Sequence, residues 1–336
     1  MTEKGSIVEE STELMTTTET THQAATGSDL APSSSRGIDF YFQCVVVVIG
    51  VVGTAANALI LYALVVSKQH KKLALIVNQN ALDLASCVFL VITYSVKLCN
   101  IPLTGNLGHW LCLTTLNDTI VWWGIIGSKF GLAILTADRY LKVVHSAWSK
   151  KKIRSWMIYL AMVFPWIMGL VWNATLAANT SAVIDGVCYY IWKNPVDKIT
   201  YEIWHFVICD VIILSIIIFC YWHILAVIRH QASVMESHSG PGPSTAQIQS
   251  SKIQTNVIKT MILICAFFVV TNVPVDVYFL LENISESWIP LGNEYYALLF
   301  LLFFYSSTNP FIYAIKFDPV KRTLLGLIPC KISVAA

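Results

Sequence analysis

The chain has 336 residues, of which 56% are hydrophobic and only 12% are charged. Soluble globular proteins carry about 25% charged residues, so this composition excludes a soluble protein and indicates an integral membrane protein. The net charge of +2 is too small to indicate nucleic-acid binding. The nine cysteines show neither a CxxC pair nor the Cys/His spacing of a zinc site.

Apolar segments of about 20 residues or more recur along the chain and predict transmembrane helices. The Ser/Thr/Glu-rich residues 1–37 come first, and we expect them to be disordered because they contain too few apolar side chains to fold. A Gly/Pro-rich stretch at 237–244 is typical of a flexible linker. After the last segment, Phe317, Val320 and Leu324 share one helical face, which predicts a helix in the membrane interface. The seven segments are 39–66, 74–98, 112–142, 156–177, 202–229, 256–282 and 295–315.

Basic residues are distributed unequally between the two sides that seven crossings define. Sixteen of the 22 lysines and arginines lie on the side that carries Arg139, five lie on the other, and Lys129 lies within a span. The positive-inside rule predicts a plasma-membrane protein with its C-terminus cytoplasmic and its N-terminus extracellular. We therefore expect a disordered extracellular segment over 1–37, a helix bundle over 38–316, and an interfacial helix with a short cytoplasmic tail over 317–336. Candidate glycosylation sequences in or near the outer segments agree: Asn173, Asn179 and Asn283.

Several short motifs occur in order, each in a matching segment. The third segment ends in Asp138-Arg139-Tyr140, and the seventh contains Asn309-Pro310-Phe311-Ile312-Tyr313. The others are Gly53-Thr-Ala-Ala-Asn57, Leu82-Asp83-Leu84, Trp166, Tyr221 and Phe268…Pro274. Together they resemble the rhodopsin-like (class A) G-protein-coupled receptors over residues 38–330. The resemblance implies an all-α bundle of seven transmembrane helices that binds an extracellular ligand and activates a heterotrimeric G protein, with arrestin and membrane lipid as further partners.

The resemblance also assigns roles to these motifs. Asp138 would hold the Arg139 guanidinium at rest, and the released guanidinium could meet carbonyls at the Gα C-terminus. Pro310 would loosen its helix so that Tyr313 can move inward. The coupling set is then Asp138, Arg139, Tyr140, Tyr221, Asn309, Pro310 and Tyr313.

Asp83 lies in the middle of its span and needs a partner there. The resemblance implies an allosteric sodium ion held by Asp83 with three further residues, and we expect no other cofactor. A protonated or hydrogen-bonded structural carboxyl is the alternative. The implied sodium ligands are Asp83, Ser128, Ser306 and Asn309.

Two predictions concern cysteines. The resemblance implies a disulfide between Cys112 and Cys188, which an extracellular location permits. Cys112 lies two residues further from Arg139 than the family usually places it, and Cys99 is a rival partner. Cys330 near the C-terminus is a candidate for palmitoylation, with a free thiol as the alternative.

The ligand site departs from two well-known classes. Val121 stands where amine receptors carry an aspartate, so a monoamine ligand is disfavoured. Phe303 stands where opsins carry the retinal-linking lysine, so the chain is not an opsin. Asn272 and Ile213 likewise replace a family tryptophan and a family proline.

Lys129 has no counterpart among the family's usual residues. A lysine at mid-membrane depth needs a partner or loses its charge. A helical wheel directs Asp210 to the same face as Tyr221, so we predict that Lys129 pairs with Asp210, with Asn272 and Asp276 nearby. The predicted core switch comprises Lys129, Asp210, Asn272, Phe268 and Pro274. The alternative is that Lys129 snorkels or faces a hydrated cavity around Asp83.

The outer third of the bundle should form the ligand pocket, although its aromatic side chains are also consistent with plain packing. Asp118 and Asp276 favour a cationic ligand and Lys97 an anionic one, and the sequence does not choose between them. The predicted pocket comprises Tyr94, Lys97, Asp118, Val121, Trp122, Ile125, His205, Asp276, Phe279, Tyr295 and Leu299.

We expect Arg139 to be only weakly restrained when no ligand is bound. Many relatives hold this arginine with an acid near the start of the sixth helix, but the matching residue here is Gln254. We therefore predict signalling without ligand.

Other functions find less support in the sequence. The chain has no metalloprotease HExxH motif and no phosphate-binding glycine loop, so we predict that it is not an enzyme. The seven segments do not divide into the repeated halves of many transporters. A chemosensory receptor for environmental cues, and a receptor that acts only through arrestin or as a decoy, remain alternatives to a receptor for a peptide or small molecule.

Overall fold

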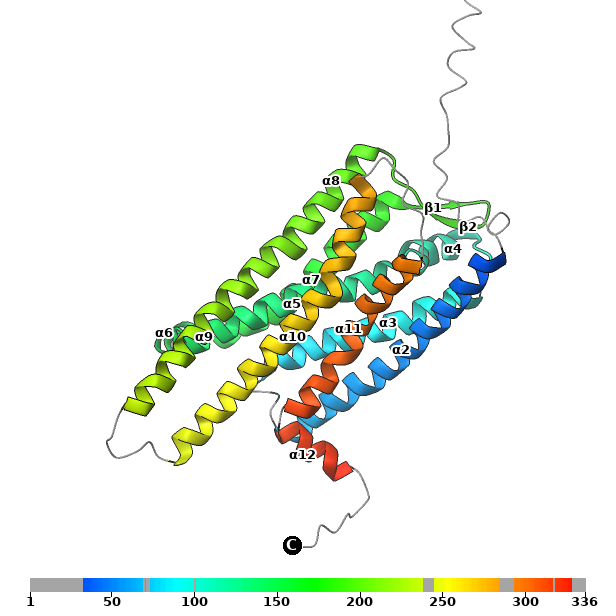
Figure 1. The fold of residues 1–336 in the computed structure, drawn as a ribbon. Coiled ribbons are helices and arrows are strands. Elements are labelled where there is room, and N and C mark those ends of the chain that lie inside the picture. Colours follow the sequence, from blue (N-terminus) through cyan, green and yellow to red (C-terminus); the bar gives the residue numbers. More distant parts are fainter. Residues whose placement is uncertain are drawn as a thin grey trace, which may run out of the picture.

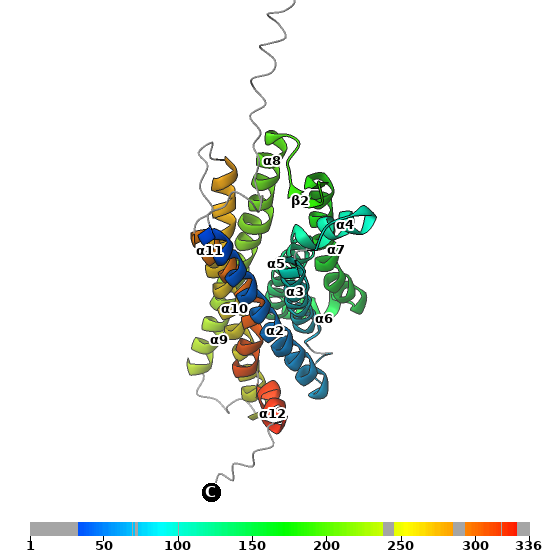
Figure 2. The same cartoon turned by 90° about the vertical axis from the view of Figure 1, so that its right-hand side faces the viewer.

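The computed structural model describes residues 33–68, 70, 73–99, 101–237, 245–284, 293–316 and 318–327. Long helices run side by side in one elongated bundle (Figures 1 and 2). Within the described residues, six helical segments are long and apolar enough to cross a membrane. They are Gly37–Val66, Ala74–Cys99, Gly105–Val143, Ser155–Thr180, Pro195–His230 and Ile258–Ile284. A further long helix, Asn293–Lys316, packs against the first and sixth of these segments.

The helices match the predicted segments closely. They are α2 Ser33–Val66, α3 Ala74–Cys99, α4 Gly105–Leu111, α5 Thr119–Val143, α6 Ser146–Lys152, α7 Ser155–Thr180, α8 Pro195–Phe206, α9 Ile213–Ser237, α10 Thr245–Ile284, α11 Asn293–Lys316 and α12 Asp318–Leu327. Two π-helical turns are η1 Cys112–Leu116 and η2 Val207–Ile212. Helix α2 begins at Ser33, inside the segment that the sequence predicts to be disordered. Residues 1–32, the linker 238–244 and Cys330 lie outside the described residues.

A short antiparallel hairpin covers one end of the bundle (Figure 1). Strands β1 Ser181–Ile184 and β2 Val187–Tyr190 pair with Val183 opposite Cys188. The turn between them uses Asp185 and Gly186, whose φ angles of 52° and 77° are left-handed. We call this the hairpin end, and we call the opposite end, where α6 and α12 lie, the α12 end.

The disulfide predicted from the resemblance is present and joins the hairpin to η1. Cys112 and Cys188 have Cα atoms 5.3 Å apart, and the rival Cys99 is an exposed free thiol. The prediction of the pairing is confirmed.

The third predicted span is interrupted where it meets the hairpin, which corrects the expectation of one uninterrupted helix. After η1 the chain turns at Asn117 and Asp118, and Asp118 has a left-handed φ of 56°. A π-helix contains more residues per turn than an α-helix. The π-turn and the break therefore accommodate the two extra residues before Arg139, so that Cys112 still reaches Cys188.

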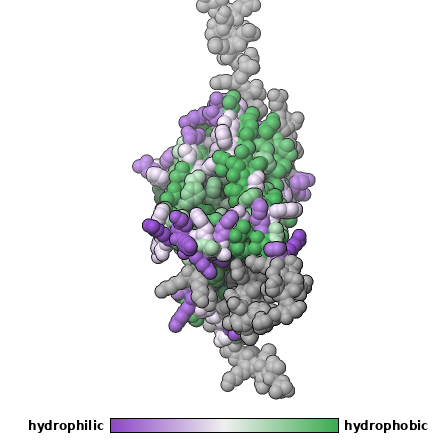
Figure 3. All heavy atoms as spheres, turned by 90° about the vertical axis from the view of Figure 1, so that its left-hand side faces the viewer, coloured by the Kyte–Doolittle hydropathy of each residue, from purple (hydrophilic) through white to green (hydrophobic). Residues whose placement is uncertain are grey.

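Much of the surface between the two ends is apolar. Figure 3 shows a broad area of hydrophobic side chains with hydrophilic ones above and below it. On α7, Tyr159 and Leu160 are 66% and 60% exposed. In water such a surface would drive aggregation, whereas in a bilayer it contacts lipid.

Helix α12 has the predicted amphipathic form. Val320 is buried and packs with Leu324 against the bundle, while Lys321 and Arg322 are exposed. The side chain of Phe317, which shares this predicted face, lies outside the described residues.

Candidate functional site

Lys129 is buried at the centre of the bundle and connects three elements. Its ammonium nitrogen, on α5, donates a hydrogen bond to Asp276 Oδ2 on α10. The same nitrogen lies 3.5 Å from Asp210 Oδ1 on η2. The three side chains are only 1–2% exposed. A buried ammonium needs counter-charges, and here it has two from different helices.

The predicted pairing of Lys129 with Asp210 is confirmed by the 3.5 Å ion pair. Asp276, which the sequence analysis placed both near Lys129 and in the ligand pocket, accepts the hydrogen bond from Lys129. The neighbouring Asn272 is fully buried and donates to the Phe268 carbonyl and to Thr271 Oγ1 of its own helix. Both of these hydrogen bonds of the Asn272 amide nitrogen lie within α10.

Asp276 also connects the cluster to the hairpin end. Its second oxygen, Oδ1, lies 3.6 Å from His205 Nε2 on α8. The other ring nitrogen of His205 accepts a hydrogen bond of 3.2 Å from Trp172 Nε1 on α7. The chain of contacts therefore runs from α7 through α8 and α10 to α5.

The π-turn η2 explains why Asp210 can face the cluster. A π-turn inserts an extra residue into a helix and rotates the side chains that follow it. Asp210 is buried in η2, while Val211 and Ile212 beside it are 46% and 47% exposed. Sequence periodicity alone does not reveal such a turn.

The remaining predicted pocket residues separate into two groups. Lys97 donates a hydrogen bond of 2.6 Å to Asp118 Oδ2, so these opposite charges neutralise each other. The Lys97 ammonium also lies 4.7 Å from the centre of the Tyr94 ring. The other predicted residues pack in one apolar cluster: Tyr94, Val121, Trp122, Ile125, Phe279, Tyr295 and Leu299.

A second buried polar network surrounds Asp83 on α3. Ser128 Oγ donates to Asp83 Oδ1 and Asn309 Nδ2 donates to Oδ2, each at 2.8 Å. Gln79, which the sequence analysis missed, donates to Ser128 Oγ at 2.6 Å. Asn57 connects the network to α11 by donating to the carbonyl of Ser306 at 3.0 Å.

These residues fit a sodium ion. The possible ligand atoms are hard oxygens, including a buried carboxyl group that is negatively charged when ionised. Among the described residues Asp83 forms hydrogen bonds but no ion pair, and the buried Asn309 Oδ1 has no hydrogen-bond partner. Asp83 and Ser128 would hold the ion, with Ser306 and Asn309 beside them, and the ion would neutralise the carboxylate.

Arg139 lies at the α12 end of α5 and is loosely held. Its guanidinium Nη2 is 3.6 Å from Asp138 Oδ2, whereas Lys142 donates to the same oxygen at 2.9 Å. The Arg139 side chain is 12% exposed, and its Nε and Nη2 form no hydrogen bond with the residues that the structure describes. The acid that should restrain Arg139 is therefore shared with a closer lysine.

The other described coupling residues have aromatic or buried surroundings. Tyr140 lies within hydrogen-bonding distance of His145 Nε2, at 3.1 Å, and its ring contacts those of Phe219 and His223. Tyr221 is buried in the apolar core. Pro310 is also buried, whereas the side chains of Tyr313 and Gln254 lie outside the described residues.

One predicted glycosylation site needs correction. Asn173 is 3% exposed and donates to the Gly169 carbonyl within α7, which leaves no room for a glycan. Asn179 is exposed in the last turn of α7, and Asn283 lies in the last turn of α10. Both stay predictions.

The described geometry agrees with a comparison against known protein families. The family model of the 7 transmembrane receptor (rhodopsin family) matches residues 56–313, most of the chain. The chain belongs to this family. Members of the rhodopsin family are receptors, so it is not an enzyme.

Similar receptors bind different kinds of ligand. Galanin receptor type 1 of Rattus norvegicus is 24% identical over 91% of this chain and 89% of its own length. The fMet-Leu-Phe receptor of Oryctolagus cuniculus is 22% identical over 92% and 89%. Opsin-3 of Mus musculus is 27% identical over 62% and 52%. At these identities the relatives support the family without indicating the ligand of this receptor.

Proposed function

We propose that this receptor binds an extracellular ligand at its hairpin end and activates a heterotrimeric G protein at its α12 end. The excess of lysine and arginine on the side of Arg139 supports this orientation in the plasma membrane. The disulfide at the hairpin end is consistent with an oxidising extracellular location.

The observation that carries the proposal is the weak restraint on Arg139. Its only described ion-pair partner is Asp138, at 3.6 Å, and Lys142 competes for that carboxylate. A guanidinium is a planar fork of donors that matches backbone carbonyls. Once the helices separate, Arg139 can donate to the carbonyl groups of an inserted Gα C-terminus.

The Lys129 cluster would convert ligand binding into helix movement. One ammonium ties α5 to carboxylates on η2 and α10, and one of these carboxylates, Asp276, also lies 3.6 Å from His205 on α8. Two-state switches of this kind respond to a ligand that binds one arrangement better than the other. A ligand that changes the Lys129–Asp276 contact would release α10 from α5.

The test is signalling without ligand. We would express the full-length receptor with a promiscuous Gα subunit and measure the second messenger at matched surface expression. We expect wild-type signalling above that of empty cells, and we expect Arg139→Ala to abolish it. Asp197→Asn, an exposed change near the start of α8, is the control and should signal as the wild type. A wild type as silent as Arg139→Ala would contradict the proposal.

A further inference from the structure

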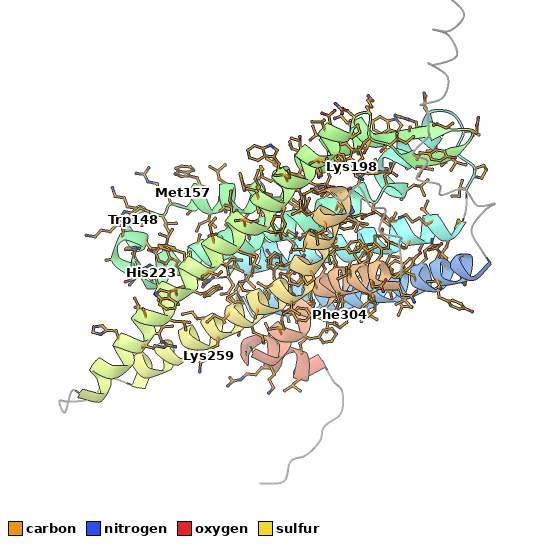
Figure 4. The ribbon with its side chains drawn as sticks, turned by 45° about the horizontal axis from the view of Figure 1, so that its top comes forward. Trp148, Met157, Lys198, His223, Lys259 and Phe304 are labelled. Carbon is orange, nitrogen blue, oxygen red and sulfur yellow. A yellow bond between two sulfur atoms is a disulfide. The ribbon has the colours of Figure 1, made fainter. Side chains whose placement is uncertain are left out.

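The buried cluster around Lys129 brings two carboxyl groups to one ammonium group, with the His205 ring beside Asp276. Asp210 and Asp276 face the single ammonium of Lys129. Glu202 lies beside Tyr201 on α8, a helix that packs against α10. Two buried carboxyl groups, on η2 and α10, thus share the single ammonium group of Lys129. Figure 4 shows Lys198 at the end of the bundle where α10 finishes.

Asp210 is the least satisfied of these acids. Neither of its oxygens has a hydrogen-bond partner among the described residues, although its side chain is only 2% exposed. A carboxylate oxygen of Asp210 lies within 4.8 Å of ligating atoms of both Asp276 and His205, so the group points into the cluster. Leaving a buried carboxylate without a full complement of partners is costly, which favours the entry of another cation.

Aromatic rings lead from the hairpin to this cluster. Tyr190 on β2 contacts Trp192 at 6.0 Å between ring centres, and Trp192 contacts Tyr201 at 5.6 Å. Tyr201 in turn contacts Trp172 and His205, at 6.1 and 6.0 Å. Aromatic faces attract ammonium and guanidinium groups. A row of aromatic rings next to two carboxyl groups that share one ammonium group can recognise an organic cation.

On the opposite side of the bundle, the two charged residues of the predicted pocket are already paired. Lys97 and Asp118 form their own pair, so neither presents a free charge to a ligand. The predicted pocket residues between the two sides belong to the apolar cluster. The sequence left the choice between a cationic and an anionic ligand open, and the arrangement of charges favours a cationic one.

We propose that the ligand carries an ammonium or guanidinium group that binds between α8 and α10, with Glu202 and Tyr201 at the entrance and Asp276 and Asp210 at the base. This inference rests on the proposed receptor function. The ligand cation competes with Lys129 for Asp276, which links ligand recognition to the α5–α10 connection. A small amine and a basic side chain of a peptide present the same chemistry.

The test is binding to the purified full-length receptor, measured by thermal shift, with probes matched in shape but not in charge. The small-amine arm compares tryptamine with neutral 3-ethylindole. The peptide arm compares acetyl-Gly-Arg-Phe-amide with the same peptide carrying citrulline instead of arginine. Each probe is titrated to about 10 mM, because small fragments bind with millimolar affinity. We expect at least one cation to stabilise the receptor saturably and its neutral isostere to do so at least about tenfold more weakly. The arm that responds identifies the source of the cation.

Variants locate the site. Glu202→Gln should raise the half-saturating concentration of the cation by about threefold to fivefold, whereas the same type of change at Asp197, on the exposed side of α8, should leave it unchanged. Tyr201→Leu should weaken binding and Tyr201→Phe should preserve it, because the attraction depends on the ring.

Three results would overturn the proposal: no shift with either cation, equal shifts with the neutral isosteres, or equal binding by Glu202→Gln. The assay contains no G protein, so its failure is distinct from a failure of signalling.

Discussion

Lys129 and Arg139 are two cations on the same helix that are restrained in opposite ways. Lys129 is 1% exposed and contacts carboxylates on two other elements, so it ties distant parts of the chain together. Arg139 is 12% exposed, and its one ion-pair partner among the described residues is the carboxylate next to it in sequence, which Lys142 also uses. A local pair restrains no helix–helix distance. We therefore expect the contacts of Lys129 to control whether the receptor signals, although the motif that marks the family contains Arg139.

Replacing Lys129 alone should have the largest effect on the receptor. Lys129→Met leaves two buried carboxylates without their counter-charge, and we expect a loss of about 3–5 kcal/mol in stability with reduced surface expression. Thermal unfolding of the purified receptor measures the loss. Lys97→Met is the matched control, since its partly exposed pair with Asp118 should contribute no more than about 1 kcal/mol. Equal effects at the two lysines would mean that the Lys129 links are weak.

Asp83 is a third buried ionisable group, and it differs from Lys129 and Arg139 because it has hydrogen bonds but no ion pair among the described residues. Sodium at about ten times its Kd should stabilise the wild type by about 1.4 kcal/mol relative to an equal concentration of choline. Thermal unfolding in the two salts measures the difference. Asp83→Asn should abolish the sodium response and Asp118→Asn should keep it. A response that survives Asp83→Asn would place the ion elsewhere.

The smallest effects should come from the two residues that determine how Arg139 is restrained, Asp138 and Lys142. Asp138→Asn removes its described ion-pair partner, so signalling without ligand should rise by about twofold to fivefold. Lys142→Met leaves Asp138 to Arg139 alone, and signalling should fall. Second-messenger accumulation at matched surface expression measures both. Changes in the same direction would show that Asp138 does not restrain Arg139.

The sequence predicts this fold well because long apolar segments leave few arrangements in a membrane. It also predicts that Lys129 and Asp210 come together, because a buried lysine needs an acid and few acids lie at that depth. It places Asp276 only near this pair, because a helical wheel gives the face on which a side chain lies but not its distance from a side chain on another helix. The burial of Asn173 was missed for a related reason, since a glycosylation motif carries no information on which face of α7 packs inward.

Gln79, Trp172 and Glu202 illustrate a further limit. None belongs to a motif, and their roles arise only from neighbours on other helices. A polar residue inside an apolar segment is a weak signal, and it could have marked Gln79 and Glu202. Trp172 gives no such signal, because tryptophan is common in membrane spans.

The most direct test of the central claim is the ligand-free signalling of Lys129→Met/Asp210→Asn/Asp276→Asn. The triple change removes the ionic link between α5 and α10 and leaves neither the ammonium nor a carboxylate of this link without its counter-charge, so the receptor should fold and reach the surface. We predict that its signalling exceeds that of the wild type by at least about threefold at equal surface density, because α10 is no longer tied to Lys129. Signalling equal to the wild type would show that the buried lysine does not control the receptor.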